Sequence, residues 1–280
     1  MLTPWLKTLF GTSQNRASKI VNVYVLRTHV WNDHTNYMFE QMQQQLGRAN
    51  VFVLFDKSNG APGVPHTNWN APARTSGPQV ITISEDECAQ INQLHNKGEH
   101  NGSMHRAEAH IYACYKAIRQ PYDFLWFIEY DIYSKDLGKA LHPFDKIKAD
   151  MLTTTFGISR YNRATRKWFW WEHLDGEIST IPLKKRRRCF FPINRFSKKF
   201  LQVIAENLSV NSGFCEVYFP TLCRLRGLSL KFFPKKLFGT FRYQPSIPEE
   251  EVLKIRHDDH RLYHPVKQLN VKALKGGDLN

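Results

Sequence analysis

Three short, strongly apolar runs constrain the fold of this chain more than any other feature. They are IVNVYVL at residues 20–26, VFVLF at 51–55 and FLWFI at 124–128, and a charged residue follows each one. Runs of this kind are typical of strands in a parallel sheet, which is buried on both faces. Because helical segments at 36–46 and 106–119 alternate with these strands, we predict an open α/β fold: a Rossmann-like mixed central sheet flanked by helices.

The remaining segments extend this α/β pattern. Further strands are expected at 80–83 and 151–156, a long Gly-, Pro- and Asn-rich loop at 59–79, and helices at 197–207 and 213–225. No repeat or boundary divides the chain, so residues 20–267 are expected to form one domain. Residues 1–19 then form an N-terminal arm and 268–280 a C-terminal tail. The arm is either frayed or an interfacial anchor built on Trp5, Leu6, Leu9 and Phe10.

Charge and cysteine content narrow the class of protein. Lys plus Arg number 39 and Asp plus Glu 25, which gives a net charge of +14. Such a surface attracts nucleic acid, anionic lipid or phosphorylated substrates. The five cysteines are odd in number and form no CxxC pair. This argues against a disulfide framework or a zinc ribbon and favours a reducing, cytoplasmic compartment. No apolar run approaches the roughly 20 residues of a membrane span.

Acidic residues end two of the predicted strands. Asp56 follows one apolar run, and Glu129 and Asp131 follow another. Ligands of open α/β sheets bind beyond the carboxyl ends of the strands. Residues two apart in a strand point the same way, so Glu129 and Asp131 would project together. Two carboxylates there can hold Mg²⁺ or Mn²⁺ and, through it, a diphosphate. The alternative is a pair of solvated acids at a strand terminus.

At these residues the chain resembles the GT-A class of glycosyltransferases. Glu129-Tyr130-Asp131 matches the DxD motif with Glu in place of the first Asp. Within Gly213–Val217, Glu216 matches the acidic position of the xED motif, although Val217 stands where Asp is usual. His264 matches the late histidine of the metal shell. The resemblance covers residues 20–267 through the order of its elements, and each motif alone is short and degenerate.

The resemblance implies an enzyme that uses a nucleotide sugar as co-substrate. Residues 20–156 would bind the nucleotide and residues 157–267 the acceptor. Asp131 would be the principal metal ligand, Glu129 would share the metal or contact the ribose, and His264 would complete the shell. Glu216 would be the general base of an inverting reaction. The donor expected is a UDP-sugar, and the acceptor is a glycan or a lipid-linked glycan, as in polysaccharide biosynthesis.

Four further residues are candidate contacts to the nucleotide. Arg27 ends the first strand, and either binds the nucleotide or pairs with an acid. Asp56 is placed to accept hydrogen bonds from a base or ribose. Arg106 would face the phosphates from the start of its helix, and Lys267 would neutralise phosphate charge. For Arg106 and Lys267 the alternatives are helix capping and ordinary exposure.

Three other clusters have more than one interpretation. The first cluster is Trp168, Trp170 and Trp171, whose rings either stack on sugars or belong to the core. Strand alternation would divide these rings between two faces. The group His257, Asp258, Asp259 and His260 either binds metal or is solvated, and His264 is the favoured ligand. The third cluster is the basic run Lys184, Lys185, Arg186, Arg187 and Arg188. It is either a solvated loop or a functional segment that binds an anionic membrane surface, binds nucleic acid or directs nuclear targeting.

Other functions remain alternatives at this stage. A basic nucleic-acid-binding protein explains the charge but leaves the acids at the strand ends unexplained, and no P-loop, helix-turn-helix or RNP-like pattern supports it. A metal-dependent nuclease or nucleotidyltransferase needs the same carboxylates. A sugar-binding module would use the tryptophans without a metal.

Overall fold

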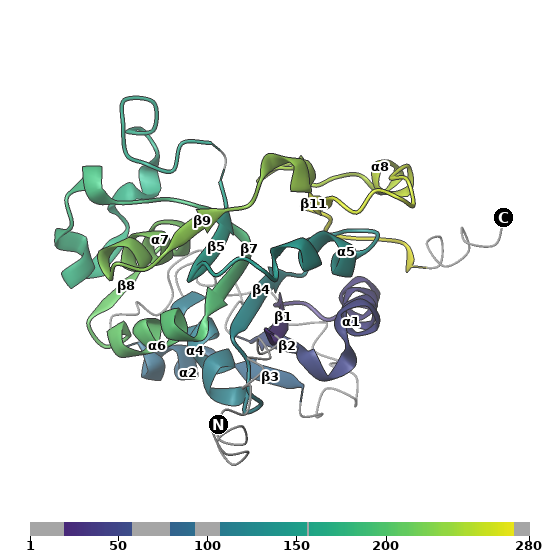
Figure 1. Cartoon of the computed structure of the whole chain (residues 1–280), viewed down its shortest axis with the longest axis horizontal. Coiled ribbons are helices and arrows are strands. Elements are labelled where there is room, and N and C mark those ends of the chain that lie inside the picture. The colour runs from purple at the N-terminus through teal and green to yellow at the C-terminus, as the bar shows by residue number, and fades with distance from the viewer. Residues whose placement is uncertain (1–19, 58–78, 93–106, 156, 272–280) are drawn as a thin grey trace, which may run out of the picture.

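A seven-stranded mixed sheet lies at the centre of the computed structural model, which describes residues 20–57, 79–92, 107–155 and 157–271. The strand order is β3-β2-β1-β4-β7-β5-β9 (Figure 1). The strands are β1 (Asn22–Thr28), β2 (Val51–Asp56), β3 (Val80–Ile83), β4 (Phe124–Glu129), β5 (Met151–Thr154), β7 (Phe190–Ser197) and β9 (Leu230–Phe232). The predicted mixed α/β class, with helices on both sides of a central sheet, is confirmed.

Burial on both faces explains the continuous apolar runs. Strands β1 to β4 are parallel to their neighbours in the order β3-β2-β1-β4. Alternate side chains of β1 enter opposite cores: Val23 and Val25 join one hydrophobic cluster, while Tyr24 and Leu26 join the other. Neither face is exposed to water, so an alternating polar pattern is absent from this strand.

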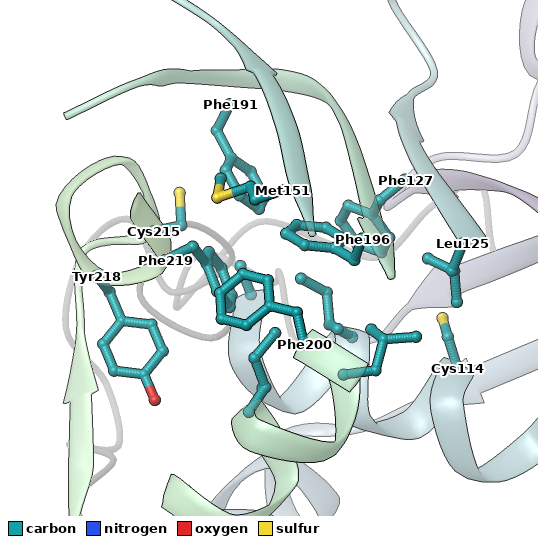
Figure 2. Packing of buried hydrophobic residues seen from close by; sticks show 14 of the residues in the cluster. Cys114, Leu125, Phe127, Met151, Phe191, Phe196, Phe200, Cys215, Tyr218 and Phe219 are labelled. Carbon is teal, nitrogen blue, oxygen red and sulfur yellow. The ribbon is translucent and has the colours of Figure 1, made fainter. Parts of the chain in front are cut away.

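One face of the sheet is covered by α2 (Glu85–Ile91), α4 (Ala107–Ala117), α6 (Lys198–Asn207) and α7 (Cys215–Leu225). Aromatic rings fill the space between this layer and the sheet (Figure 2). Phe219 of α7 stacks on Phe191 with ring centroids 5.2 Å apart, and Phe196 lies 5.8 Å from Phe200 of α6. These contacts fix the start of α7 against β7.

The opposite face is covered by α1 (Asp33–Leu46), α5 (Leu137–Leu141) and α8 (Glu249–Leu253), together with the parallel pair β10 (Phe238–Phe241) and β11 (Leu262–His264). Helix α1 begins three residues earlier than predicted because of a capping box. The Asn32 side chain accepts from the Thr35 amide, and the Thr35 hydroxyl accepts from the Asn32 amide.

Strand β7 was not predicted, although it is central and antiparallel to both β4 and β5. Pro192 and Arg195 interrupt its apolar pattern, and both are unusual in a central strand. Pro192 lies where the pairing with β5 becomes irregular. Arg195 is fully buried, donates to the carbonyls of Phe144 and Ile147, and lies 4.0 Å over the Phe124 ring.

The tryptophan-rich segment forms a 3₁₀ helix, η4 (Phe169–Glu172), so strand alternation does not divide its rings between two faces. A 3₁₀ helix brings residues three apart together, and Trp168 therefore packs edge-on against Trp171 at 5.1 Å. The short antiparallel pair β6 (Leu174–Gly176) and β8 (Asn211–Gly213) follows. The other 3₁₀ helices are η2 (Arg48–Asn50), η3 (His142–Phe144), η5 (Glu177–Thr180), η6 (Leu183–Lys185) and η7 (Lys235–Leu237).

Several predicted segments lie outside the described residues. They are the arm at 1–19, nearly all of the loop at 59–79, Arg106, and the tail from 272. Within the described ranges, no helix has both the length and the apolar character needed to cross a bilayer.

Candidate functional site

The candidate site lies at the carboxyl ends of β1 and β4, where the two parallel strands finish side by side. Arg27 of β1 is the register partner of Glu129 of β4. Beyond β4 the chain turns sharply, and the Tyr130 amide donates to the Arg27 carbonyl at 3.0 Å. The turn places Asp131 immediately past the strand end, where the residue is 7% exposed.

The C-terminal strand β11 brings His264 to the same place. Tyr133 and Tyr263 form an antiparallel bridge with backbone bonds of 2.9 and 2.8 Å, and the Val266 amide donates to the Asp131 carbonyl at 2.8 Å. Residues more than 130 positions apart along the chain are thereby held in contact. His264 is buried at the end of β11, 4% exposed.

Glu129, Asp131 and His264 form a compact group of potential ligands. One ligand atom from each lies within 4.8 Å of the others. The Nδ1 of His264 lies 2.7 Å from the Arg242 carbonyl, which can only accept, so Nδ1 carries a proton. The Nε2 faces Asp131 Oδ1 at 3.4 Å. That buried oxygen has no hydrogen-bond partner in the described part of the chain.

Two acceptor atoms that face each other need a positive charge between them. Either a proton on His264 Nε2 or a bound cation supplies it. Burial lowers the pKa of His264, but the nearby carboxylates of Asp131 and Glu129 and the Arg242 carbonyl raise it above its ordinary value overall. Two carboxylates and an imidazole whose second nitrogen is held by a backbone carbonyl suit Mn²⁺ or Mg²⁺, so the residues fit a divalent cation.

Glu129 belongs to this group and also forms an ion pair with Arg27. Its Oε1 accepts a charged hydrogen bond from Arg27 Nη1 at 2.8 Å. Burial raises the pKa of Glu129 and Asp131 raises it further, while Arg27 opposes both. Of the two interpretations for Arg27, the structure shows the ion pair with an acid. Glu129 therefore lies at the edge of the group, whereas Asp131 Oδ1 and His264 Nε2 face each other directly.

Glu216 lies at the start of α7, beside Phe191 of β7, the strand that borders β4. It is 7% exposed and accepts the Phe191 amide at 3.2 Å. Burial raises its pKa to about 8; the Phe191 amide and the charge of Arg188 oppose the rise, and the charge of Glu129 adds to it. A carboxyl group whose pKa lies near neutral pH, in electrostatic contact with a second acid, has the properties of an acid–base group.

The candidate nucleotide contacts have different positions. Asp56 is buried at the end of β2, with Oδ2 3.5 Å from His110 Nε2 on α4. Lys267 is exposed two residues beyond the cis bond that follows His264. The charges of Lys267, Asp56 and Asp131 all affect the pKa of His29, so these three residues lie near it. Arg106 lies outside the described residues.

Sequence reasoning missed two histidines in this region. His29 directly follows β1, and its ring lies edge-on to Tyr130 at 5.3 Å. His34, near the start of α1, is buried, with Nε2 3.2 Å from the Tyr130 carbonyl. His29 sits beside Arg27 at a recognised strand end, so its position was a usable signal. His34 carries no such signal because only the packing of α1 brings it to the site.

The group His257–His260 lies outside the potential metal ligands Glu129, Asp131 and His264. In the group before β11, Asp258 pairs with Arg256, and Asp259 pairs with Arg261 at 2.5 Å, so His264 alone of that segment joins Glu129 and Asp131.

The basic run is not a uniformly solvated loop. Arg186 is buried and donates to the carbonyls of Ile181, Trp171 and Ser179. Arg188 lies 5.1 Å over the Trp168 ring. Lys184 and Lys185 are exposed, while Arg187 is half-buried.

No protein-family model matches the chain, and no curated protein matches it in sequence. Among solved structures, it is similar to the galactosyltransferase LgtC in complex with donor and acceptor sugar analogues. The TM-score is 0.38 at 9% identity, and the match covers 84% of this chain and 78% of that one. An active-site mutant of LgtC is similar at a TM-score of 0.38 and 8% identity, covering 85% of this chain and 82% of that one.

Proposed function

We propose that this chain is a metal-assisted glycosyltransferase. It would move a sugar from a nucleoside-diphosphate sugar, a UDP-sugar by preference, to a glycan or lipid-linked acceptor. One observation supports this most: Asp131 Oδ1, buried and without a described hydrogen-bond partner, faces the Nε2 of His264 at 3.4 Å. Glu129 lies beside this pair, and Glu216 lies within electrostatic reach of Glu129.

The divalent cation would be held by Asp131 and His264, with Glu129 at the rim. A cation there supplies neutralising charge for a diphosphate leaving group. Arg27, which Glu129 orients, and Lys267 provide two further positive charges in the same region. Asp56 and the neighbouring His29 are candidates for polar contacts to the nucleoside.

Glu216 is the proposed general base. Its carboxylate would take the proton from the attacking acceptor hydroxyl, and a direct displacement then inverts the anomeric carbon. The base must be ionised to do this. The pKa of Glu216 is about 8, and the negative charge of Glu129 is one cause of this raised value. Positive charge near Glu129 would therefore lower the pKa of Glu216 and favour its ionised form.

Residues 20–267 form the proposed catalytic unit. The nucleotide side is built from β1, β2 and β4, and the acceptor side from residues after β5, with β11 returning to complete the site. The exposed Lys184 and Lys185 are candidate contacts to an anionic membrane that carries a lipid-linked acceptor; Arg186 is excluded from this role by its burial.

A melting-temperature screen tests the nucleotide and metal assignments. UDP, GDP and CDP, and their sugars, are added with and without Mn²⁺ to the wild-type protein, Asp131→Asn and the control Asp258→Asn. A nucleotide at about 100 times its Kd stabilises the folded protein by about 2.7 kcal/mol. We expect a Mn²⁺-dependent increase with one nucleotide family, lost in Asp131→Asn and kept in Asp258→Asn, whose side chain pairs with Arg256 at the surface.

Two results would contradict the proposal. One is a Mn²⁺-dependent nucleotide shift that survives in Asp131→Asn. The other is the absence of any nucleotide shift together with salt-sensitive binding of DNA or RNA, which favours a nucleic-acid-binding protein. Analysis of the product formed from the stabilising donor separates sugar transfer from nucleotidyl transfer. Electron paramagnetic resonance of Mn²⁺ titrated into each variant reports the metal site without any nucleotide.

A further inference from the structure

An exposed aromatic surface lies on the acceptor side of the molecule. It consists of Phe169, Trp170 and His173, and is called the aromatic platform below. Phe169 is 68% exposed, the largest value among the exposed apolar side chains of the described residues. Its ring lies 5.2 Å from Trp170 and 4.4 Å from His173. Trp170 and His173 are half-buried, so they support the Phe169 ring and leave its outer face to the surface. An exposed ring held by two half-buried ones is a candidate contact for a ligand.

The platform is held rigidly from below. Trp170 stacks on Phe214 with centroids 4.2 Å apart and planes 11° from parallel. The Phe214 amide donates to the His173 carbonyl at 2.9 Å, and Leu174 pairs with Gly213. Gly213 has φ of 155°, and a Cβ there would lie 2.7 Å from the His173 carbonyl oxygen. Only glycine permits this close approach, so the sequence keeps the platform against the start of α7.

Side-chain contacts connect the platform to Glu216. Phe214, beneath Trp170, immediately precedes α7 and is two residues from Glu216. The Trp168 ring lies 6.2 Å from Phe214 and 5.1 Å below the Arg188 guanidinium. The charge of Arg188 acts on Glu216. A continuous series of contacts therefore runs from the proposed base to the exposed rings.

The chemistry around the platform selects its occupant. Exposed charges of both signs adjoin it in sequence: Arg166 and Lys167 come before it, Glu172 lies between Trp170 and His173, and Asp175 comes after it. The two acids offset the two bases, so these four side chains give no net attraction to an anionic membrane. A purely apolar partner would leave all four charges desolvated. A sugar ring fits both features: its C–H face carries partial positive charge that stacks on an aromatic face, and its hydroxyls bond to charged groups at the rim.

We propose that the aromatic platform docks a sugar ring of the acceptor glycan, one or more units away from the hydroxyl that reacts at Glu216. This inference rests on the proposed function and adds to it. The acceptor is then an oligosaccharide long enough to reach from Glu216 to Phe169, rather than a monosaccharide or a small aglycone.

Binding to an array of immobilised oligosaccharides of defined linkage and length, with UDP and Mn²⁺ present, tests the platform. Phe169→Ala removes the exposed ring, and Phe169→Trp restores one. Tyr243→Ala is the matched control because Tyr243 is similarly exposed, at 61%, in the segment between β10 and α8. We expect about a threefold to tenfold weaker binding for Phe169→Ala, as for loss of one aromatic contact. Phe169→Trp and Tyr243→Ala should bind like the wild type.

Three results would overturn the inference: binding by Phe169→Ala equal to that of the wild type, an equal loss in Tyr243→Ala, or no oligosaccharide bound by a wild-type protein that still shows the nucleotide shift. Failure of the proposed function has a different signature. In that case the nucleotide shift is absent, while oligosaccharide binding that depends on Phe169 identifies a sugar-binding module. Circular dichroism of each variant confirms that its fold is unchanged.

Discussion

Two buried glutamates, Glu108 and Glu216, have similarly raised pKa values but different neighbours. Burial raises the pKa of each to about 8. Glu108, on α4, has one oxygen held by Asn92 and Ser212 at 3.0 Å each. Glu216 accepts one backbone amide and lies between the charges of Glu129 and Arg188. A raised pKa therefore marks burial in both, and the neighbouring groups distinguish an interior hydrogen-bond acceptor from a candidate base.

The largest predicted difference is in sugar transfer. Glu216→Gln keeps an oxygen for the Phe191 amide but cannot accept a proton, so we expect transfer to fall about 100-fold or more. Glu108→Gln should retain the wild-type rate within about threefold, since it makes no contact with the reacting groups. Product formation from the donor found by the melting screen measures both. An active Glu216→Gln would remove the assignment of this residue as base.

The second prediction concerns the stability that the hydrogen bonds of Glu108 contribute. Glu108→Ala leaves the Asn92 and Ser212 donors without their shared acceptor and opens a cavity, so we expect a loss of about 2–4 kcal/mol. Glu108→Gln, which keeps an acceptor at the same position, should lose less than about 1 kcal/mol. Urea unfolding at pH 6 measures both values. Equal losses in the two variants would show that these hydrogen bonds contribute little.

The third difference concerns pH. The pKa of Glu108 is about 8 in the folded protein and 4.5 without the fold. The folded state therefore binds more protons than the unfolded state between these values, and stability falls as pH rises through them. One such group contributes a slope of up to about 1.4 kcal/mol per pH unit. Urea midpoints from pH 5 to 8 should decline less steeply in Glu108→Gln; an unchanged slope would place the titration elsewhere.

Features that depend on a local stretch of sequence were predictable, whereas contacts between distant segments were not predictable from local pattern. The apolar runs of β1, β2 and β4 are local, and so is the position of Glu129 and Asp131 at a strand end. The contact of His264 with Asp131 was expected from family resemblance alone, because it depends on pairing across more than 130 residues. Strand β7 was missed because Pro192 and the buried Arg195 oppose the local pattern.

The environment of Glu108 was not predictable because it depends on contacts between distant segments of the chain. Its partners Asn92 and Ser212 come from two separate segments, and the periodicity of α4 gives no reason to expect a carboxyl group in the interior. For the tryptophan segment the sequence alone does not separate a strand from a 3₁₀ turn, because aromatic residues occur in both. The contact of Trp168 with Trp171 at a spacing of three residues distinguishes the two.

The smallest predicted effect belongs to Arg188, the positive charge near Glu216. Its charge lowers the pKa of Glu216, against the larger effect of burial. Arg188→Met keeps a side chain over Trp168 but removes the charge, so the pKa of Glu216 should rise and the ionised base should appear only at higher pH.

Transfer at pH 7 by Arg188→Met should consequently fall by less than about tenfold, because one partly exposed charge is lost while the base remains. The rate at high pH should approach the wild-type plateau, since Glu216 is then ionised in both proteins. The pH profile of the transfer rate measures this shift, and Arg188→Lys, which keeps the charge, is the control. A uniform loss at every pH would mean that Arg188 acts by positioning Trp168 and the aromatic platform, and that burial and Glu129 alone set the pKa of the base.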